Sequence, residues 1–390
     1  MNTTKLKNVC VVVSGTTPKS TDKRYWNGTH VWITPAELSE DSFIVTDSER
    51  HITDEAIKAT GLKSFPKGTV LLSSRAPIGK VAIAGCEMYC NQGFKNLICS
   101  ESIYNLYLYY FLKSKTAYLN SLGRGATFKE ISKGIVEDIS IPFPVYSEQI
   151  RIAKQLQKIS ELISLKKGQY RYFDDIIRSR FIEMFGNVGE IDKHKVHDAF
   201  VTKLGDVANV KSSHRVFTSE FVESGIPFYR GTEIGELSNG QIPKHPFYIT
   251  REHYEKLAND DSRPKIGDLL LPSICNNGQI WLVDTNKPFY YKDGRVLCIS
   301  PYPDVFNSIY LLYYLKYRLT YEYPKLGSGS TFAEFKIFQL KNMDVLVPNI
   351  MKQNLFANFI HQVDKSKLAV QKSLDELEIL KKSLMQTYFG

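Results

Sequence analysis

The 390-residue sequence contains no long hydrophobic run. Outside the tyrosine-rich stretches, the longest uninterrupted apolar run covers residues 9–13. The tyrosine-rich stretches themselves, at 104–112 and 310–317, are broken by Asn105 and Lys316. A membrane-spanning helix needs about 20 apolar residues, and the first residues lack the hydrophobic core of a signal peptide. The sequence therefore argues against a membrane or secreted protein and predicts a cytoplasmic one.

Cysteine is scarce. Six residues at irregular spacing predict reduced thiols rather than a disulfide framework. Cys86 and Cys90 form one close pair, but no second Cys or His pair lies nearby to complete four zinc ligands, so we expect no metal site. The formal net charge of +9 is spread along the chain, which permits a polyanionic partner without identifying one.

Motifs of the common DNA-directed enzymes are also missing. The chain has no Gly-x-x-x-x-Gly-Lys-[Ser/Thr] loop, and without any Pro-Pro pair it lacks the Asn/Asp-Pro-Pro-aromatic segment of adenine methyltransferases. Neither His-Glu-x-x-His, Gly-x-Ser-x-Gly nor a His-x-Glu with paired cysteines occurs. The sequence therefore gives no support to these chemistries.

What the chain does contain is an internal repeat of about half its length. Residues 123–131 (GRGATFKEI) recur as residues 327–335 (GSGSTFAEF), and this offset of 204 holds without a gap to the end of the chain. The same offset pairs Pro144 with Pro348 and Gln149 with Gln353. Several separated matches at one offset indicate a duplication.

Weaker matches continue upstream with shifting offsets, as loops of different length require. Residues 6–9 match 204–207, 32–37 (WITPAE) match 228–233 (FYRGTE), 68–72 (GTVLL) match 267–271 (GDLLL), and 102–104 (SIY) match 308–310 (SIY). The order is the same in both halves. This pattern predicts two similar globular domains, each followed by a similar tail.

Each tail has the apolar spacing of a long helix. Steps of four and three residues place apolar side chains on one stripe, which is typical of a coiled-coil seam. The predicted seam residues are Ile152, Leu156, Ile159, Ile163, Tyr170, Phe173, Ile177 and Met184 in the first tail and Phe356, Ile360, Val363, Val370, Leu374, Leu377, Leu384 and Tyr388 in the second. Some 36 residues at ~1.5 Å each would give a rod of roughly 54 Å.

Connectivity predicts how these helices pair. The first helix leads from domain one to domain two, and its equivalent partner is the second helix, so packing the two seams by a twofold operation makes them antiparallel with the domains at opposite ends. The alternative is that each helix packs only on its own domain. The predicted organisation is domain one at 1–146, a helical spacer at 147–186, domain two at 187–348 and a second helical spacer at 349–390.

Within the domains, both strands and helices are predicted. Apolar runs at 9–13, 70–72, 81–84 and 269–271, bounded by glycine and proline, favour strands, whereas 102–121 and 308–322 favour helices. The predicted fold class is therefore mixed α/β, with two similar globular domains separated by two long antiparallel coiled-coil helices in a pseudo-twofold arrangement.

One enzymatic pattern does match. Pro303-Asp304 followed by Glu334-Phe-Lys336 fits a loose nuclease template in which two carboxylates hold Mg²⁺ and the lysine assists the attacking water. The repeat weakens it, because Glu130 occupies the position equivalent to Glu334 and no lysine follows it at the required place. A Mg²⁺-dependent DNA endonuclease stays open as an alternative.

Polar side chains in the variable segments are candidates for DNA contacts. Arg suits guanine and Asn or Gln suits adenine in the major groove, while Lys, Ser and Thr suit phosphates. The candidates in domain one are Thr16, Lys19, Lys23, Arg24, Arg75, Lys80, Gln92, Arg124, Thr127 and Lys129. Those in domain two are Lys211, Arg215, Arg230, Asn276, Asn277, Gln279, Thr331 and Lys336. The alternative for each is a solvated surface residue.

These features together resemble a known family. Each variable domain closes on Gly-x-Gly-x-Thr-Phe-x-Glu and leads through Pro144…Gln149 or Pro348…Gln353 into its helix, which is similar to the DNA-specificity subunit of type I restriction–modification systems. The resemblance covers essentially the whole chain and includes residues 32–35 (WITP) and 79–93. The second domain departs from it at Lys292-Asp-Gly294.

The resemblance implies a protein that is not itself an enzyme. Each variable domain would be a target-recognition domain for one half of a split double-stranded DNA sequence, and the helices would act as the spacer and as docking surfaces for two methyltransferase subunits. S-adenosylmethionine, ATP and Mg would be bound by those subunits and by restriction subunits, not by this chain. A coiled-coil adaptor without DNA binding is the second alternative.

Overall fold

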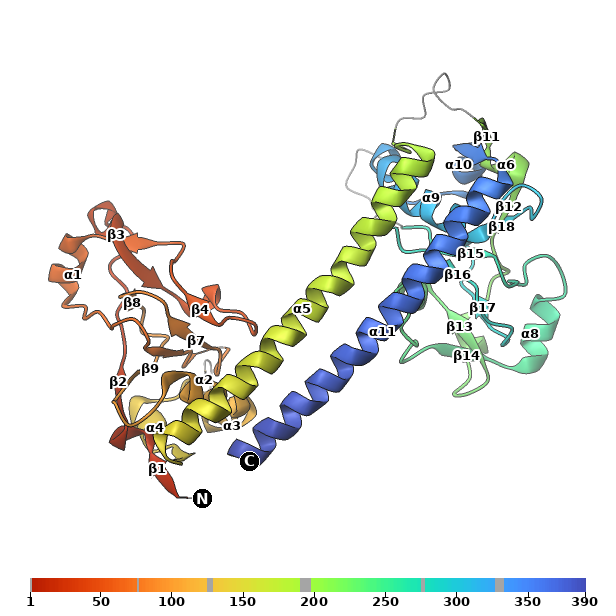
Figure 1. Ribbon diagram of the computed structural model, residues 1–390. Helices are drawn as coiled ribbons and strands as arrows, with labels where there is room; N and C mark the ends of the chain where they lie inside the picture. The colour runs from red at the N-terminus through yellow and green to blue at the C-terminus, as the bar shows by residue number, and fades with distance from the viewer. Residues whose placement is uncertain (1, 76, 125–128, 190–197, 275–277, 327–332) are drawn as a thin grey trace. The chain divides into compact units, whose positions relative to one another are not determined.

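The computed structural model describes residues 2–75, 77–124, 129–189, 198–274, 278–326 and 333–390. Backbone contacts divide the chain into two compact units, residues 1–169 with 370–390 (unit 1) and residues 170–369 (unit 2). Each unit holds one globular domain and segments of two long helices, α5 (Tyr146–Phe185) and α11 (Ile350–Phe389), labelled in Figure 1. In the part of the chain described, no helix has the length and hydropathy needed to cross a bilayer.

The domain of unit 1 is built on a five-stranded sheet in the order β2-β9-β6-β7-β4. Its strands are β2 (Cys10–Val13), β9 (Asn96–Cys99), β6 (Val70–Leu72), β7 (Val81–Ala84) and β4 (Ile44–Val45). A three-stranded sheet orders β5 (His51–Ile52), β3 (Trp26–Ile33) and β8 (Tyr89–Cys90), and β1 (Thr3–Lys5) pairs with β10 (Ser140–Pro142). The helices are α1 (Asp54–Thr60), α2 (Asn105–Ser114), α3 (Thr116–Leu122) and α4 (Lys133–Glu137).

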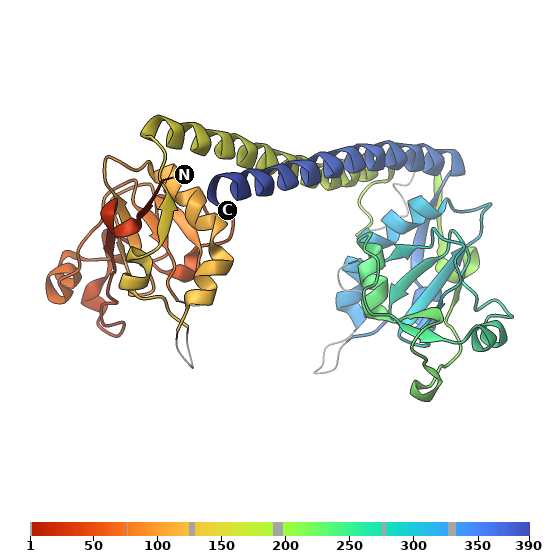
Figure 2. The ribbon, with the colours of Figure 1, turned by 90° about the horizontal axis from the view of Figure 1, so that it is seen from below.

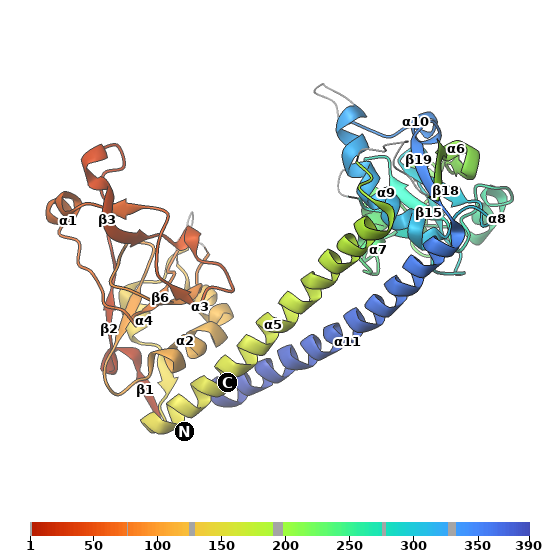
Figure 3. The same cartoon turned by 45° about the horizontal axis from the view of Figure 1, so that its top comes forward.

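Both faces of this five-stranded sheet are covered. Val70 lies in a core formed with Tyr107 and Phe111 of α2, which Figure 3 shows beside the sheet, whereas Leu71 lies in a separate core with Phe94. Successive side chains of a strand point to opposite faces, so a strand between two cores is apolar at every position. This explains the uninterrupted apolar runs from which β6 and β7 were predicted.

The domain of unit 2 has a four-stranded sheet in the order β12-β18-β15-β16. Its strands are β12 (Ala208–Lys211), β18 (Val296–Pro301), β15 (Leu269–Pro272) and β16 (Trp281–Leu282). A three-stranded sheet orders β14 (Phe247–Ile249), β13 (Ile226–Tyr229) and β17 (Tyr290–Tyr291), and β11 (Ala199–Lys203) pairs with β19 (Asp344–Pro348). The helices are α6 (Leu204–Val207), α7 (Gly231–Ser238), α8 (Arg251–Leu257), α9 (Ser308–Glu322) and α10 (Ile337–Lys341).

The two domains share one topology, which confirms the predicted duplication. The order β2-β9-β6-β7 and its antiparallel pairing recur as β12-β18-β15-β16. The parallel pair of β3 and β8, with Trp32 opposite Tyr89, recurs as β13 and β17, with Phe228 opposite Tyr290. The fold is mixed α/β, as the sequence predicted.

One predicted match between the halves is wrong by three residues. The sequence aligned Tyr104 with Tyr310, but the Tyr107 hydroxyl donates to the Pro142 carbonyl (2.9 Å) just as the Tyr310 hydroxyl donates to the Leu346 carbonyl (3.0 Å). Tyr107 is therefore the equivalent of Tyr310. The error equals about one helical turn, which a tyrosine-rich helix sequence does not resolve because similar side chains recur at each turn.

The helix predicted at 102–121 is two helices. Thr116 and Ser114 donate side-chain hydrogen bonds to the Lys113 and Phe111 carbonyls, 3.1 and 2.7 Å away, where α2 ends and α3 begins. Short hydroxyl side chains that bond to nearby carbonyls compete with the regular helix. The other predicted elements, β2, β6, β7, β15 and α9, are confirmed.

Within each unit, segments of α5 and α11 run antiparallel. In unit 1, the Tyr388 hydroxyl donates to Gln155 (3.0 Å) and Lys167 pairs with Glu378 (3.1 Å). In unit 2, Lys367 pairs with Asp174 (2.5 Å), and the rings of Phe181 and Phe356 lie 5.3 Å apart. In both units a later residue of α5 meets an earlier residue of α11. Figure 2 shows these helix segments along one side of each domain taken by itself.

The end of each long helix packs into a domain core. Phe389 is buried against Tyr107 and Phe111 in unit 1, and Phe181 is buried against Tyr310 in unit 2. Each domain therefore contacts segments of both long helices. The alternative in which each helix packs only on its own domain is wrong.

Most predicted seam residues are removed from solvent. The buried ones are Ile152, Leu156, Ile159, Ile163, Ile177, Phe356, Ile360, Val363, Val370 and Leu374, and the partly buried ones are Tyr170, Phe173, Met184, Leu377, Leu384 and Tyr388. Ile159 and Ile163 pack with Leu374 between the two helices. The predicted seam omitted Phe181 and Phe389. Both pack on the domains, and Phe181 also contacts Phe356 of α11.

Candidate nucleic-acid interface

The segment between β2 and β3 carries four of the predicted contact residues of domain one. Two buried tryptophans fix its backbone: the Trp32 indole donates to the Thr16 carbonyl (3.1 Å), and the Trp26 indole donates to the Lys19 carbonyl (3.2 Å). Their rings are in edge contact at 5.1 Å. A buried indole N–H needs an acceptor, so the sequence that builds this core also holds the segment in one conformation.

Thr16, Lys19, Lys23 and Arg24 are exposed on this segment. Arg24 donates two hydrogen bonds to Asp22 (3.0 and 2.7 Å), and these bonds lower the pKa of the Asp22 carboxyl. The structure therefore places these four side chains together on one loop, with the guanidinium held in a fixed direction.

The nearby Gln92 contacts the same loop. It accepts a hydrogen bond from the Thr17 hydroxyl (2.6 Å), which joins the segment after β8 to the segment after β2. Gln92 is exposed. Two predicted contact regions that lie 75 residues apart in sequence are thus brought together.

Domain two has the equivalent segment after β12. Ser14 donates to the Phe94 carbonyl (2.9 Å) in domain one, and Ser212 donates to the Val296 carbonyl (3.4 Å) in domain two. Beyond this shared contact the residues differ: His214, two residues after Ser212, pairs with Asp260 (2.7 Å), whereas Thr16 stands two residues after Ser14. The hydrogen bond from His214 lowers the pKa of the Asp260 carboxyl.

Lys211 and Arg215 flank this second segment. Lys211 is partly buried at the end of β12, and Arg215 is exposed with its Nε 3.3 Å from Asp293. Partial burial raises the pKa of Asp293, but hydrogen bonds from Lys292 and Arg215 outweigh it and the net pKa is lowered. Arg215 therefore faces a permanently ionised carboxylate at neutral pH.

The glutamate of the repeated motif pairs with two cations in each domain. Glu130 accepts hydrogen bonds from Arg75 Nε (2.9 Å) and Lys95 Nζ (3.1 Å). Partial burial raises the pKa of Glu130, but the two cations outweigh it and the net pKa is lowered. We call these three residues the first glutamate cluster.

The second glutamate cluster consists of Glu334, Arg295 and Lys336. Glu334 pairs with Arg295 through one carboxylate oxygen and with Lys336 through the other, 2.9 Å away. The backbone beside it is also equivalent, because Phe335 donates to the Ser273 carbonyl (2.7 Å). The predicted contact residues Arg75 and Lys336 thus lie in matching clusters.

Two further predicted residues, Lys80 and Arg230, make hydrogen bonds within their own domain. Lys80 is partly buried and donates to the Pro35 carbonyl (3.3 Å) and to the Leu38 carbonyl. Arg230 donates to Glu233 (2.6 Å), and its guanidinium lies over the Phe247 ring at 4.4 Å. Both cations are positioned by contacts within their own domain.

The remaining predicted residues are placed as follows. Arg124 and Lys129 are exposed beside the first glutamate cluster, and Gln279 is partly buried. Thr127, Asn276, Asn277 and Thr331 lie outside the described residues. Contact with DNA stays a prediction for every residue of the set.

Sequence reasoning missed two cations of the clusters, Lys95 and Arg295. Both come from the segment that leads into the strand beside β6 or β15, and neither belongs to a motif. The repeated glutamate was the available signal, because a partly buried carboxylate requires a cationic or hydrogen-bonding partner.

A second shared feature joins each domain to its long helix. Gln149 is fully buried at the start of α5, accepts a hydrogen bond from the Tyr104 N–H (2.9 Å), and donates to the Ser102 and Pro144 carbonyls (3.2 and 3.0 Å). These three bonds connect the starts of α5 and α2, since Tyr104 precedes the first residue of α2.

Gln353 makes the same contacts at the start of α11. It accepts from the Asn307 N–H (2.9 Å) and donates to the Val305 and Pro348 carbonyls (2.9 and 2.8 Å). Asn307 precedes α9 as Tyr104 precedes α2. We call these two sites the glutamine junctions. They fix the direction in which each long helix leaves its domain.

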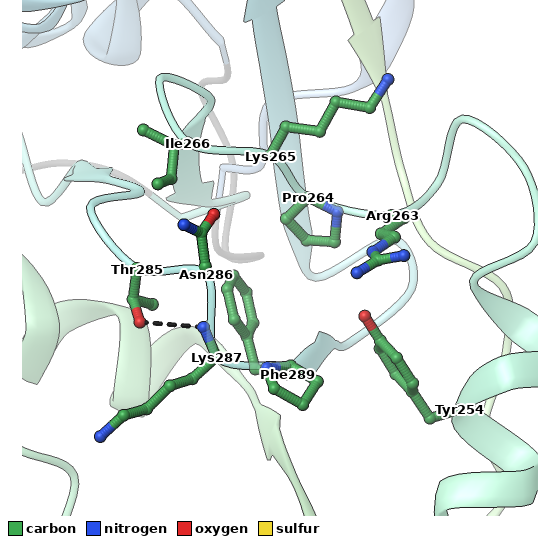
Figure 4. Close-up of a pocket in the computed structure, with 10 residues that line it drawn as sticks. Tyr254, Arg263, Pro264, Lys265, Ile266, Thr285, Asn286, Lys287 and Phe289 are labelled. Carbon is green, nitrogen blue, oxygen red and sulfur yellow. Dashed lines mark hydrogen bonds between the residues drawn. The ribbon is translucent and has the colours of Figure 1, made fainter.

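Figure 4 shows a pocket of about 230 Å³ in domain two, lined by Tyr254, Arg263, Pro264, Lys265, Ile266, Thr285, Asn286, Lys287, Pro288 and Phe289. Its cationic side chains do not converge: Arg263 points toward the Tyr254 hydroxyl, while Lys265 and Lys287 point away from each other. A ligand site normally combines an apolar wall with a few convergent polar groups. This pocket therefore does not supply one.

The geometry at Glu334 disagrees with the nuclease alternative. Both of its carboxylate oxygens face cations, Arg295 and Lys336, rather than a second carboxylate. Among the described residues no group of three His, Cys, Asp or Glu side chains is placed to hold a metal ion. A two-carboxylate Mg²⁺ site at Asp304 and Glu334 has no support in this arrangement.

The fold and these sites define a class of protein: a duplicated two-domain chain with polar loops on a common framework and two long helices. Comparison with known proteins gives the family. The profile of the type I restriction modification DNA specificity domain matches residues 1–171 and 198–378. The chain belongs to this family and is a specificity subunit of a type I restriction–modification system, which recognises a DNA target.

Individual relatives agree. The chain is 30% identical to the MjaIX specificity subunit of Methanocaldococcus jannaschii, over 98% of this chain and 90% of that protein. It is 23% identical to the EcoprrI specificity subunit of Escherichia coli, over 92% and 86% of the two chains. Coverage of this extent in two full-length relatives agrees with the family assignment over the whole chain.

Two solved structures share the fold. The S subunit from M. genitalium matches with a TM-score of 0.56 at 16% identity, covering 100% of this chain and 96% of that chain. A chain from a study of complex assembly and conformational transition of the type I R-M system matches with a TM-score of 0.65 at 18% identity, covering 100% and 97%.

Proposed function

We propose that this specificity subunit recognises a bipartite, asymmetric target in double-stranded DNA, with one half-site bound by each domain. The observation that carries the proposal is the repeated framework with different polar side chains on equivalent loops. The loop after β2 presents Lys19, Lys23 and Arg24, whereas the loop after β12 presents His214 and Arg215. Different side chains at equivalent positions recognise different bases.

In this proposal the two long helices set the gap between the half-sites. The antiparallel contacts of α5 with α11 in each unit and the glutamine junctions support this role. Proteins with twofold symmetry bind half-sites about 34–36 Å apart along one face of the duplex. A fixed helix length then permits one gap length.

Partner subunits supply the chemistry. Two methyltransferase subunits with S-adenosylmethionine modify adenine, and restriction subunits use ATP and Mg²⁺, while this chain is non-catalytic. Large apolar side chains exposed on the long helices support protein partners there: Leu165 and Ile379 in unit 1 and Tyr172 and Leu368 in unit 2 are each 68–73% exposed. Where such side chains are contiguous, exposed apolar surface marks protein interfaces.

The test is to co-express the chain with the products of its neighbouring genes and to map N6-methyladenine across the host genome. We expect methylation at one sequence made of two different half-sites separated by a gap of constant length. A continuous target, a gap of variable length, or no methylation that depends on this chain would contradict the proposal. The last result is also the one expected of an adaptor without DNA binding.

A further inference from the structure

The two glutamate clusters pair a carboxylate with cations that include the predicted DNA contacts Arg75 and Lys336. Glu130 binds Arg75 and Lys95, and Glu334 binds Arg295 and Lys336. The two glutamates occupy the same place in the repeat, although their cationic partners come from different positions. The carboxylate is therefore the shared part of the cluster, and its partners vary.

Exposure shows which cations remain available to DNA. The side chain of Arg75 is 45% exposed, whereas that of Lys95 is 10% exposed. In the second cluster Arg295 and Lys336 are 59% and 58% exposed, whereas Glu334 is 18% exposed. The exposed cations, Arg75 in the first cluster and Arg295 and Lys336 in the second, can reach a phosphate, but the less exposed carboxylate competes for them.

This competition acts differently on target and non-target DNA. Non-target binding depends on phosphate charge neutralisation, so a carboxylate that offsets one cation removes about one phosphate contact. Target binding adds directed contacts to base edges. A carboxylate that holds a guanidinium in one direction favours such directed contacts and opposes the non-directional ones.

We propose that Glu130 and Glu334 are specificity-determining residues that weaken the attachment of this subunit to non-target duplex DNA. The inference rests on the proposed function, because it requires DNA binding by both domains. It adds a role for the carboxylates: they lower non-target affinity more than target affinity.

The test uses the complex of this chain with its methyltransferase subunits. Glu130→Gln and Glu334→Gln keep the shape of the side chain and remove its charge. Binding is measured by fluorescence anisotropy between 50 and 300 mM KCl on a labelled duplex that carries the mapped target and on a duplex of equal length with both half-sites scrambled.

Each substitution is expected to raise non-target affinity about 5–10-fold near 0.1 M salt and to steepen the salt dependence by about one unit of log K per log[salt]. Target affinity rises less, so the ratio of target to non-target affinity falls. Adding Arg75→Gln to Glu130→Gln is expected to return non-target affinity to about the wild-type value, because the released cation is then removed.

Two matched controls carry the same charge change elsewhere. Glu101→Gln and Glu223→Gln alter exposed glutamates, and Glu101 follows β9 at the end opposite to Lys95. These controls are expected to leave the ratio of target to non-target affinity unchanged. Thermal unfolding of every variant identifies a loss of structure.

The outcomes separate this inference from the proposed function. If the wild-type complex does not distinguish the target from the scrambled duplex, the proposed function fails. If the wild type distinguishes them while both variants leave non-target affinity unchanged or lower it, the inference is overturned. A purely structural role for the glutamates predicts weaker binding to both duplexes and a lower unfolding temperature.

Discussion

Carboxylates accompany four of the five predicted DNA-contacting arginines. Arg24, Arg75, Arg215 and Arg230 each donate to an Asp or Glu side chain of the same domain. Solvent screening at the exposed guanidinium keeps the contribution of such pairs to stability small, although the Glu233 carboxylate paired with Arg230 is itself buried. Their main effect is on the direction of the guanidinium and on the local charge that DNA would meet.

The sequence identified the arginines but not these pairs. Arg24 and Asp22 are two residues apart, whereas Arg75 and Glu130 are 55 apart and meet only after the strands have paired. Residue type and repeat position predict which side chains carry chemistry. They do not predict which distant side chains meet, because loop conformation depends on contacts such as those of Trp26 and Trp32.

Lys23 gives a test at the scale of one residue. It is exposed on the loop after β2, and we expect it to contact a phosphate. Lys23→Ala should weaken binding of the complex to target and scrambled duplexes alike, about 5–10-fold near 0.1 M salt, and lower the salt slope by about one. Anisotropy titrations over a salt series measure both.

Lys7→Ala is the matched control for this prediction. Lys7 is exposed, pairs with Asp138 at 3.0 Å and lies before β2, at the end opposite to the loop. Its removal should leave the salt slope unchanged. Equal effects of the two substitutions would show that Lys23 acts only through net charge.

At the scale of elements, the sequence repeat located the two residues of the glutamine junctions but gave no reason why both are glutamine. The repeat aligned Gln149 with Gln353 at the common offset of 204 residues. The structure shows why an amide is required: one side chain must both accept from an N–H and donate to two carbonyls. No apolar or charged residue of that size does both.

Gln149→Leu is therefore expected to destabilise unit 1 by about 2–4 kcal/mol, because three hydrogen bonds are lost and the buried backbone groups that made them have no partner. Gln353→Leu should have a similar effect on unit 2. Chemical denaturation followed by tyrosine and tryptophan fluorescence measures the change.

Gln169→Leu is the control, since Gln169 is exposed on the same helix and its replacement is expected to change stability by less than about 0.5 kcal/mol. A Gln149→Leu variant as stable as this control would refute the stabilising role given to the junction. Retained stability with lost discrimination between gap lengths would instead assign Gln149 to helix direction alone.

The helix seam was also predicted in part. Four-three spacing located Ile159, Ile163 and Leu374, which meet in unit 1. It did not locate Phe181 and Phe389, which pack on Tyr310 and on Tyr107. The periodicity of a helix sequence shows which side chains form its apolar stripe. It does not show where that stripe packs on the other long helix and where it packs on a domain.

At the scale of the whole molecule, duplication explains most of what the sequence predicted. Two copies that fold alike give the same signal twice, so mixed α/β domains, shared strands and long helices were all accessible without a structure. The variable loops differ in sequence between the two domains, so one loop does not help to predict the structure of the other. The bases that each domain recognises depend on these loops, so the shared framework does not determine them.

The central claim is that helix length sets the gap and the domains set the half-sites. Inserting one heptad after Gln169 in α5 and one after Ala369 in α11 lengthens both helices by about 10 Å, which corresponds to up to about three base pairs. The measurement is the N6-methyladenine map of cells that carry this variant with its methyltransferase. We predict the original half-sites with a changed gap, and altered half-sites with the original gap would contradict the account.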